Sequence, residues 1–208
     1  MNQPLLYGII DLGYVAPDDL VTRTRELLAG GVDLLQLRAK NQSEEDILAW
    51  AKLLQPLCSE AKVPFIVNDF PHIAQAVGAD GVHIGQDDGT LNDVRAIVGP
   101  DMIVGRSTHS PEQAQAALKE GFNYIGFGPV YPTPTKAGRP AIGLENIQAV
   151  QDSVGAHIPV CCIGGIKPEN LNEVLQAGAR SIVIVSGLLC ADDPTATTRD
   201  VKSRLSQT

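Results

Sequence analysis

Short apolar runs alternate with longer amphipathic segments along almost the whole chain. The short runs read as nearly continuous hydrophobic stretches, which is typical of parallel strands covered by helices. The longer segments often begin with Ser, Asp or Pro, which are helix start signals. The predicted strands are 5–11, 34–38, 65–67, 81–84, 102–107, 124–127, 159–163 and 181–185. The predicted helices are 18–28, 43–60, 71–77, 91–98, 111–120, 143–154, 168–176 and 194–205.

A glycine recurs between a helix end and the strand that follows it. The junctions are "LLAGGVDLLQLR", "AVGADGVHIG", "LKEGFNYIGFG" and "LQAGARSIVIVSG", with Gly31, Gly78, Gly121 and Gly178 at the turn. Glycine at this point supplies the left-handed residue that ends a helix. Such short helix-to-strand connections are typical of repeated βα units.

The repeat predicts an α/β fold, a (β/α)8 TIM barrel, formed by residues 1–208 as one catalytic domain. Strands and helices alternate at roughly 26 residues per unit, near the compact limit of this fold. A doubly wound open sheet is the competing architecture. That architecture needs fewer strands than the eight predicted here. The GxGxxG motif that marks dinucleotide-binding members of that class does not follow the first predicted strand.

Composition and net charge limit the classes of partner that we expect this protein to bind. Only 4% of residues are aromatic against 44% hydrophobic, so the core is expected to be aliphatic. A net charge of −8 argues against nonspecific nucleic-acid binding. No signal peptide and no apolar run of about 20 residues is visible, so we expect no membrane partner. The cysteines have no CxxC spacing, which favours free thiols in a reducing cytoplasm.

Candidate chemistry lies where the predicted strands end, because loops at this end form the active-site face of such barrels. The second strand runs into "QLRAK", which places Gln36, Arg38 and Lys40 at alternate positions on one face. Two cations and an amide suit a phosphate or pyrophosphate. The alternative is a strand end whose charges are simply solvated.

Carboxylates follow the third and fourth strands. "VNDF" supplies Asn68 and Asp69, and "HIGQDD" supplies Asp88. Carboxylates on neighbouring strands repel unless a cation joins them, and Mg²⁺ is usually held by one or two carboxylates with phosphates completing its shell. The alternative is that Asp69 and Asp88 are helix N-caps.

The next two loops carry hydroxyl groups, a histidine and a lysine. "VGRSTHS" offers Ser107 as a ligand, and His109 either as a general acid or base or as a packed loop residue. In "FGPVYPTPTKAGRP", Thr133, Thr135 and Lys136 lie on a chain stiffened by prolines, which reduces the entropy lost on binding.

The last two strands end in "IGGIKPEN" and "VSG". Backbone amides of Gly164, Gly165, Val185 and Ser186 match the phosphate site often found after strands 7 and 8 of such barrels. The open end of the barrel, where the carboxyl ends of the strands meet, is therefore expected to offer two anion sites and one metal site. No nucleophile–base pair is visible, and a reaction that releases pyrophosphate needs mainly charge neutralisation and positioning.

Taken in order, "QLRAK", "VNDF…VHIGQDD", "GRSTHS", "GPVYPTPTK", "IGGI" and "VSG" resemble the thiamine-phosphate synthase family over nearly the whole chain. The resemblance implies Mg²⁺-dependent coupling of a hydroxymethylpyrimidine diphosphate with a thiazole phosphate, which gives thiamine phosphate and pyrophosphate. It implies a dissociative substitution, with small-molecule substrates as partners. It leaves the oligomeric state open.

The resemblance also implies roles for matching residues. The implied pyrimidine-diphosphate ligands are Gln36, Arg38, Lys40, Asn68, Ser107 and Lys136, of which Arg38, Lys40, Ser107 and Lys136 are the expected catalytic set. The implied Mg²⁺ ligands are Asp69 and Asp88. The implied thiazole-phosphate site is Thr133, Thr135, Gly165, Val185 and Ser186.

Two other functions fit the same motifs. A thiazole tautomerase shares the barrel and uses a histidine in the loop after the fifth strand, here His109. A non-catalytic thiamine-phosphate-binding paralogue is the second alternative, although it is expected to lose charges that are costly when unpaired. Phe70 departs from the synthase pattern, in which a charged residue often follows "ND".

Overall fold

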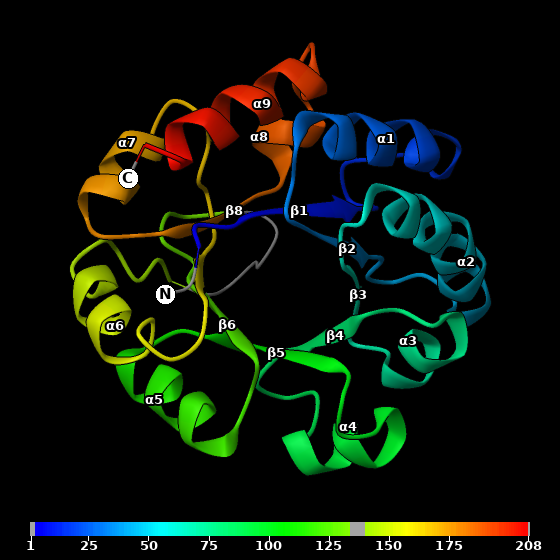
Figure 1. The fold of residues 1–208 in the computed structure, drawn as a ribbon, viewed down its shortest axis with the longest axis horizontal. Coiled ribbons are helices and arrows are strands. Elements are labelled where there is room, and N and C mark those ends of the chain that lie inside the picture. Colours follow the sequence, from blue (N-terminus) through cyan, green and yellow to red (C-terminus); the bar gives the residue numbers. More distant parts are fainter. Residues whose placement is uncertain (1–2, 134–139, 208) are drawn as a thin grey trace.

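A closed parallel barrel forms the centre of the computed structural model, which describes residues 3–133 and 140–207. Within these residues each strand pairs with its neighbours in chain order, and the last strand pairs with the first (Figure 1). The strands are β1 (Leu6–Asp11), β2 (Leu34–Arg38), β3 (Phe65–Asn68), β4 (Gly81–Ile84), β5 (Ile103–Thr108), β6 (Tyr124–Phe127), β7 (Val160–Cys162) and β8 (Ser181–Ile184). The predicted fold class is confirmed, and the open doubly wound sheet is wrong.

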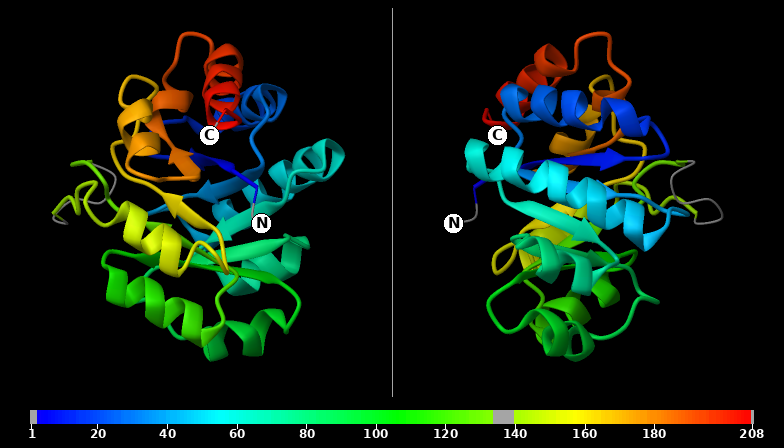
Figure 2. Two further views of the ribbon diagram at one scale, coloured as in Figure 1. Left: turned by 60° about the vertical axis from the view of Figure 1, so that its left-hand side comes forward. Right: turned by 90° about the vertical axis from the view of Figure 1, so that its right-hand side faces the viewer.

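Helices surround this barrel as an outer ring (Figures 1 and 2). They are the 3-10 helix η1 (Pro17–Asp19), α1 (Leu20–Gly30), α2 (Glu44–Ala61), α3 (Pro71–Val77), α4 (Leu91–Val98), α5 (Pro111–Glu120), α6 (Ile147–Ser153), α7 (Leu171–Gln176), α8 (Ser186–Leu189) and α9 (Pro194–Leu205). No helix in the described part of the chain combines the length and apolar character that crossing a bilayer requires.

Helices α6 and α7 begin three or four residues later than the sequence predicts, and the short helix α8 was missed. Helix α6 starts at Ile147 rather than at 143, where Gly143 has a left-handed φ of 72°. Helix α7 starts at Leu171 rather than at 168. Helix α8 has only four residues, too few to leave a periodic pattern in the sequence.

Three of the four repeated glycines cap helices as predicted, whereas Gly178 follows Ala177, the residue that caps α7. Gly31, Gly78 and Gly121 are left-handed caps of α1, α3 and α5, with φ of 96°, 64° and 95°. Each donates its backbone N–H to carbonyls in the last turn of its helix. The caps allow the next strand to begin within three residues, which keeps the βα units short.

Strand alternation divides the buried side chains into two cores. Side chains that point into the barrel form an inner cluster of Tyr7, Ile9, Leu34, Ile66, Tyr124, Cys161 and Val183. Their neighbours along each strand point outward and pack against the helices, so Cys161 lies inside and Cys162 outside. All four cysteines are free thiols.

The closing seam joins the two ends of the chain. β8 pairs with β1 through Leu6↔Ile182, Tyr7↔Val183 and Gly8↔Ile184. Outside this seam α9 packs on α1, and the Thr195 hydroxyl donates to the Glu26 carbonyl at 3.1 Å. Residues far apart in the sequence therefore depend on each other for burial.

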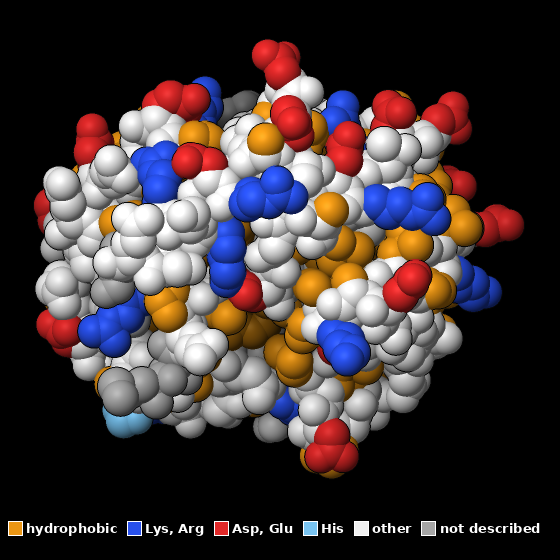
Figure 3. Space-filling model, turned by 45° about the horizontal axis from the view of Figure 1, so that its top comes forward, with side chains coloured by type: hydrophobic (Ala, Val, Ile, Leu, Met, Phe, Trp, Pro, Cys, Tyr) orange, Lys and Arg blue, Asp and Glu red, His pale blue; other side chains and the backbone are white. Residues whose placement is uncertain are grey.

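Charged side chains are intermixed on the face shown in Figure 3. Asp and Glu side chains lie among Lys and Arg there, without a large single-sign patch. On this face, acidic and basic side chains are thus interspersed rather than separated.

Replacing Gly105 by Ala is expected to destabilise the barrel by about 1–3 kcal/mol through overpacking. Gly105 faces the barrel interior, and a Cβ there meets Cζ of the Tyr124 ring at 2.1 Å. Equilibrium unfolding in urea measures the loss. Gly126→Ala is the matched control, because its Cβ lies 3.6 Å from the nearest atom, His83 Cε1. Equal stability losses in the two variants would contradict this account of the packing.

Candidate active site

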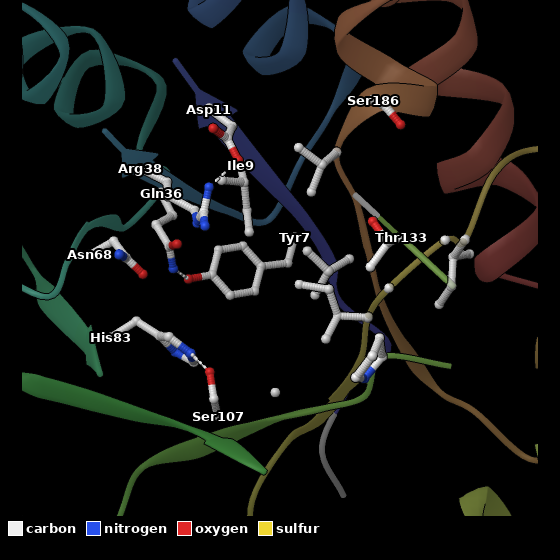
Figure 4. Close-up of a pocket in the computed structure, with 18 residues that line it drawn as sticks. Tyr7, Ile9, Asp11, Gln36, Arg38, Asn68, His83, Ser107, Thr133 and Ser186 are labelled. Carbon is white, nitrogen blue, oxygen red and sulfur yellow. Dashed lines mark hydrogen bonds and ion pairs between the residues drawn. The ribbon is translucent and has the colours of Figure 1, made fainter. Parts of the chain in front are cut away.

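A pocket opens at the carboxyl ends of the strands, and we call it the mouth pocket (Figure 4). Every strand, or the loop after it, contributes to its wall. Its lining residues are Tyr7, Ile9, Asp11, Gln36, Arg38, Asn68, His83, Ser107, Gly126, Pro129, Thr133, Ile163, Gly164, Gly165, Ile166, Val183, Val185 and Ser186. Parallel closure therefore brings side chains from the whole length of the chain to one place.

Most of the residues singled out in the sequence line this pocket. Those that do are Gln36, Arg38, Asn68, Ser107, Thr133, Gly165, Val185 and Ser186. Lys40, Asp69 and Asp88 follow β2, β3 and β4 at the same end but are not among its lining residues. The predicted ligands Thr135 and Lys136 lie outside the described residues.

Arg38 is held at the pocket by a carboxylate that sequence reasoning missed. Asp11 ends β1, is 2% exposed, and accepts a hydrogen bond of 2.7 Å from Arg38 Nη1 (Figure 4). Its other oxygen accepts from the Gly13 backbone N–H at 2.9 Å. Asp11 thus fixes the Arg38 guanidinium and part of the β1 loop together. The available signal was an acidic residue closing the otherwise apolar run "LYGIID".

Asp69 and Asp88 lie close enough to influence each other. Burial raises the pKa of the Asp69 carboxyl, the Lys40 ammonium opposes this rise, and the Asp88 carboxylate adds to it. Asp69 Oδ2 is buried, and among the described residues no hydrogen bond of ordinary geometry reaches it. It forms an ion pair with Lys40 Nζ. Asp88 Oδ2 accepts from the Gly85 N–H at 2.8 Å.

The capping alternative for these two carboxylates is wrong. The N-cap of α3 is Phe70, and the N-cap of α4 is Thr90, which forms a capping box with Asp93. Asp69 instead has a left-handed φ of 64°, uncommon for a residue with a side chain. Two hard oxygen donors on neighbouring strands fit a divalent cation whose shell is completed by ligand phosphates. Among the described residues no cluster of three or more metal-ligating side chains occurs.

A chain of polar groups continues from the pocket into the barrel. His83 is 8% exposed, lines the pocket and contacts Ser107 Oγ through Nε2 at 3.0 Å (Figure 4). Its Nδ1 contacts the Tyr124 hydroxyl at 3.0 Å, which in turn contacts the Tyr7 hydroxyl at 2.9 Å. Gln36 Nε2 donates to Tyr7. Sequence reasoning expected no serine–histidine contact here.

Gly164 and Gly165 let the loop after β7 approach the loop after β6. A Cβ on Gly164 lies 2.4 Å from Pro129 Cα, and a Cβ on Gly165 lies 2.6 Å from Tyr131 Cβ. Both have positive φ, 101° and 65°. Any larger residue at either position displaces backbone, so these glycines set the shape of one pocket wall.

His109 joins two loops and is not among the pocket-lining residues. Its Nδ1 lies 2.5 Å from the Gly128 carbonyl oxygen after β6, and its backbone N–H donates to Gln113 Oε1 at 2.8 Å. Ser110 caps the helix α5 that follows. This geometry favours the packed loop histidine over the general acid or base.

Comparison with known proteins gives a consistent result. The sequence pattern of the family described as "Thiamine monophosphate synthase" matches residues 6–188. A thiamine-phosphate synthase of Thermus thermophilus is 46% identical over 183 residues, which cover 88% of this chain and 87% of the relative. One from Shouchella clausii is 42% identical over 189 residues, covering 90% of each.

A solved structure agrees in fold over the full length. The thiamine phosphate pyrophosphorylase from Pyrococcus furiosus superposes with a TM-score of 0.88 at 34% identity, covering 99% of this chain and 97% of that one. The resemblance drawn from the sequence motifs is confirmed by these matches.

The Asp11–Arg38 pair is expected to show a coupling energy of about 1.5–3 kcal/mol in a double-mutant cycle of unfolding free energies. The variants are Asp11→Asn, Arg38→Gln and their combination. The Arg38 and Asp11 side chains are only 17% and 3% exposed, so little solvent screening weakens the interaction.

The control cycle uses Arg23 and Glu26 on α1. This pair has a similar N–O distance, 2.8 Å, but its side chains are 31% and 29% exposed. Its coupling is expected to stay below about 1 kcal/mol. A coupling at Asp11–Arg38 no larger than this control value would show that Asp11 does not hold Arg38.

Proposed function

The chain belongs to the thiamine monophosphate synthase family, and we propose from this premise that it catalyses the synthase reaction with substrates bound in the mouth pocket. The reaction joins 4-amino-2-methyl-5-hydroxymethylpyrimidine diphosphate to a thiazole phosphate, giving thiamine phosphate and pyrophosphate. The observation that carries the proposal is the family match over residues 6–188, which spans the barrel and the loops that form the mouth.

The proposed reaction is a substitution at the methylene carbon of the pyrimidine. The bond from this carbon to the diphosphate oxygen breaks, and its electron pair leaves with the pyrophosphate. The thiazole nitrogen then donates its lone pair to the carbon and forms the new C–N bond. Such a reaction depends on stabilising the leaving group and aligning two substrates, which is work for fixed charges and a shaped pocket.

We assign the diphosphate end to the cationic side of the mouth. Arg38 supplies a guanidinium whose planar fork suits phosphate oxygens, and Asp11 holds it in place. Lys40 supplies a second charge from the loop after β2. Gln36, Asn68 and Ser107 are proposed to contact the pyrimidine diphosphate from the pocket wall. Lys136 stays a sequence prediction for the same group.

We assign the thiazole phosphate to the opposite wall. Thr133, Gly165, Val185 and Ser186 lie there on the loops after β6, β7 and β8. Backbone amides and hydroxyl groups are suitable donors for a phosphate. Thr135 stays a sequence prediction.

Asp69 and Asp88 are proposed to hold Mg²⁺. The support is the buried Asp69 oxygen without an ordinary hydrogen bond and the neighbouring Asp88 carboxylate. When bound, the ion supplies charge neutralisation for the departing diphosphate. Lys40 neutralises Asp69 in this structure, and its ammonium would be available to the substrate if Asp69 held the ion instead.

The alternatives receive less support. His109 contacts the Gly128 carbonyl and does not line the mouth pocket, which disfavours a tautomerase centred on it. The described charged residues Arg38, Lys40, Asp69 and Asp88 are all retained, which disfavours a non-catalytic paralogue. Free thiols throughout fit the expected reducing cytoplasm.

Asp69→Asn is expected to lower Mg²⁺-dependent pyrophosphate release by about 10²-fold or more, because one ligand charge of the metal site is lost. The assay supplies both substrates and Mg²⁺ and follows pyrophosphate. Asp101→Asn, which removes an exposed carboxylate at the amino end of β5, is the matched control and should retain full activity. Absence of release from the unaltered protein would refute the proposed function, whereas normal release from Asp69→Asn would refute only the metal assignment.

His109→Ala is expected to keep pyrophosphate release within about tenfold of the parent protein, whereas loss of a proton-transfer group costs about 10²–10⁴-fold. The variant loses one contact between loops, so a small decrease in thermal stability should accompany it. Isomerisation of a carboxythiazole phosphate that disappears in His109→Ala, without any pyrophosphate release, would assign the protein to the tautomerase instead.

A further inference from the structure

We propose that Arg106 is a positioning residue for the metal site. Its guanidinium holds the loop between β4 and α4, residues 85–90, which we call the β4 loop and which carries Asp88. The place of the Asp88 carboxylate therefore depends on Arg106. This inference deepens the Mg²⁺ assignment and rests on the proposed function.

Arg106 lies beside the point where β4 ends and the β4 loop begins. In the register of β4 and β5, its partner is Ile84, the last residue of β4. Its neighbour Ser107 lines the pocket, so the Arg106 side chain is on the outer face of β5. Val104 and Thr108 on this outer face are fully buried, whereas Arg106 is half-buried. A cation at this position is within reach of the loop that leaves the neighbouring strand.

The guanidinium bridges two carbonyls of the β4 loop. Nη1 donates to the Gly89 carbonyl at 2.7 Å, and Nη2 donates to the Gln86 carbonyl at 3.2 Å. These carbonyls lie one residue after and two residues before Asp88. The direction of both hydrogen bonds is fixed, because a guanidinium only donates and a carbonyl oxygen only accepts. Arg106 thus spans the segment that carries the carboxylate.

The guanidinium is itself held by an aromatic ring. Its Cζ lies 5.3 Å from the centroid of the Phe122 ring, and Phe122 is 2% exposed. Contact with the face of a buried ring restrains the planar guanidinium. Arg106 therefore presents its two nitrogens from a defined place.

Two further contacts connect Asp88 with β5. Gln86 Nε2 donates to the Ser107 backbone carbonyl at 2.5 Å, and a carbonyl oxygen requires a donor, so the amide nitrogen must face it. Within the loop, the Gly85 N–H donates to Asp88 Oδ2 at 2.8 Å. A Cβ on Gly85 would lie 2.7 Å from the same oxygen. Asp88 is thus fixed on a loop backbone that is in turn fixed to β5.

The composition of the β4 loop explains why it needs an anchor. Residues 87–90 are exposed, and Gly85 and Gly89 offer no side chain for packing. Glycine also loses more backbone freedom on ordering than other residues do. Thr90 forms a capping box that fixes the end of the loop next to α4. The Arg106 contacts restrain the middle of the loop, where the carboxylate is.

The charge and the geometry of Arg106 have opposite effects on a metal ion. A nearby guanidinium repels Mg²⁺, so loss of its charge alone should strengthen metal binding. Loss of the two hydrogen bonds should weaken metal binding, because the carboxylate is no longer held in place. Lysine keeps the charge but cannot span both carbonyls, whereas glutamine loses the charge as well. These two substitutions therefore separate the two effects.

Arg106→Lys and Arg106→Gln are both expected to raise the Mg²⁺ concentration for half-maximal pyrophosphate release by about tenfold or more. The kcat at saturating Mg²⁺ should stay within about threefold of the parent value, because the substrate contacts remain. A lower Mg²⁺ requirement in Arg106→Gln, with no change in Arg106→Lys, would leave Arg106 with a charge effect only and overturn the positioning role.

Arg95→Lys is the matched control. Arg95 Nη1 donates to the Gly99 and Met102 carbonyls, and its Nη2 donates to Asn123 Oδ1 at 2.9 Å. These contacts lie at the amino ends of β5 and β6, at the opposite end of the barrel from the β4 loop. We expect both lysine variants to lower the urea midpoint of unfolding similarly, but only Arg106→Lys to change the Mg²⁺ requirement. An equal change in Arg95→Lys would reflect general destabilisation and overturn the inference.

Hydrogen exchange tests the anchor without metal or substrates. The Gly85 amide, which Asp88 Oδ2 protects, is followed by NMR in the substrate-free protein. We expect its exchange to become about fivefold faster or more in Arg106→Lys and to stay unchanged in Arg95→Lys. Unchanged exchange in Arg106→Lys would overturn the inference. If the parent protein released no pyrophosphate, the proposed function would fail, and these exchange rates would still decide whether Arg106 holds the loop.

Discussion

Closure of the parallel sheet is the constraint on which the rest of this structure depends. Because every strand pairs in parallel with its neighbours and β8 completes the ring on β1, all the carboxyl ends meet at one mouth. Side chains as far apart in the chain as Asp11 and Ser186 then line one pocket. The same closure creates an interior that is sealed from the helices, so any polar group that points inward must find its partner among the other inward-pointing residues.

That interior explains why the site is both polar and stiff. Tyr7, Tyr124 and His83 occupy positions that aliphatic residues fill elsewhere in the inner cluster, and they satisfy one another. Gly105 leaves room for the Tyr124 ring, so a residue without a side chain is as necessary to the network as those that form it. The polar side chains Tyr7, Tyr124 and His83 are therefore part of the packing of the barrel interior.

The sequence predicted the fold because its signals were local and repeated. Gly31, Gly78 and Gly121 marked helix ends, and the apolar runs marked the strands to within a residue or two. It also predicted Gln36, Arg38 and Ser107 at the mouth, because position after a strand suffices for that. Asp11 and Tyr124 were missed because their importance lies in contacts across the barrel, with Arg38 and His83, that no spacing along the chain reveals.

The closing seam has a consequence for how the protein is made. β1 is synthesised first, but one of its edges has no partner until residues 181–184 leave the ribosome. Until β8 emerges this edge presents unpaired backbone groups, which is the condition that favours association between nascent chains. The high sequence separation of the seam also predicts slow final closure. For this chain, the last strand to emerge decides whether the first one is protected.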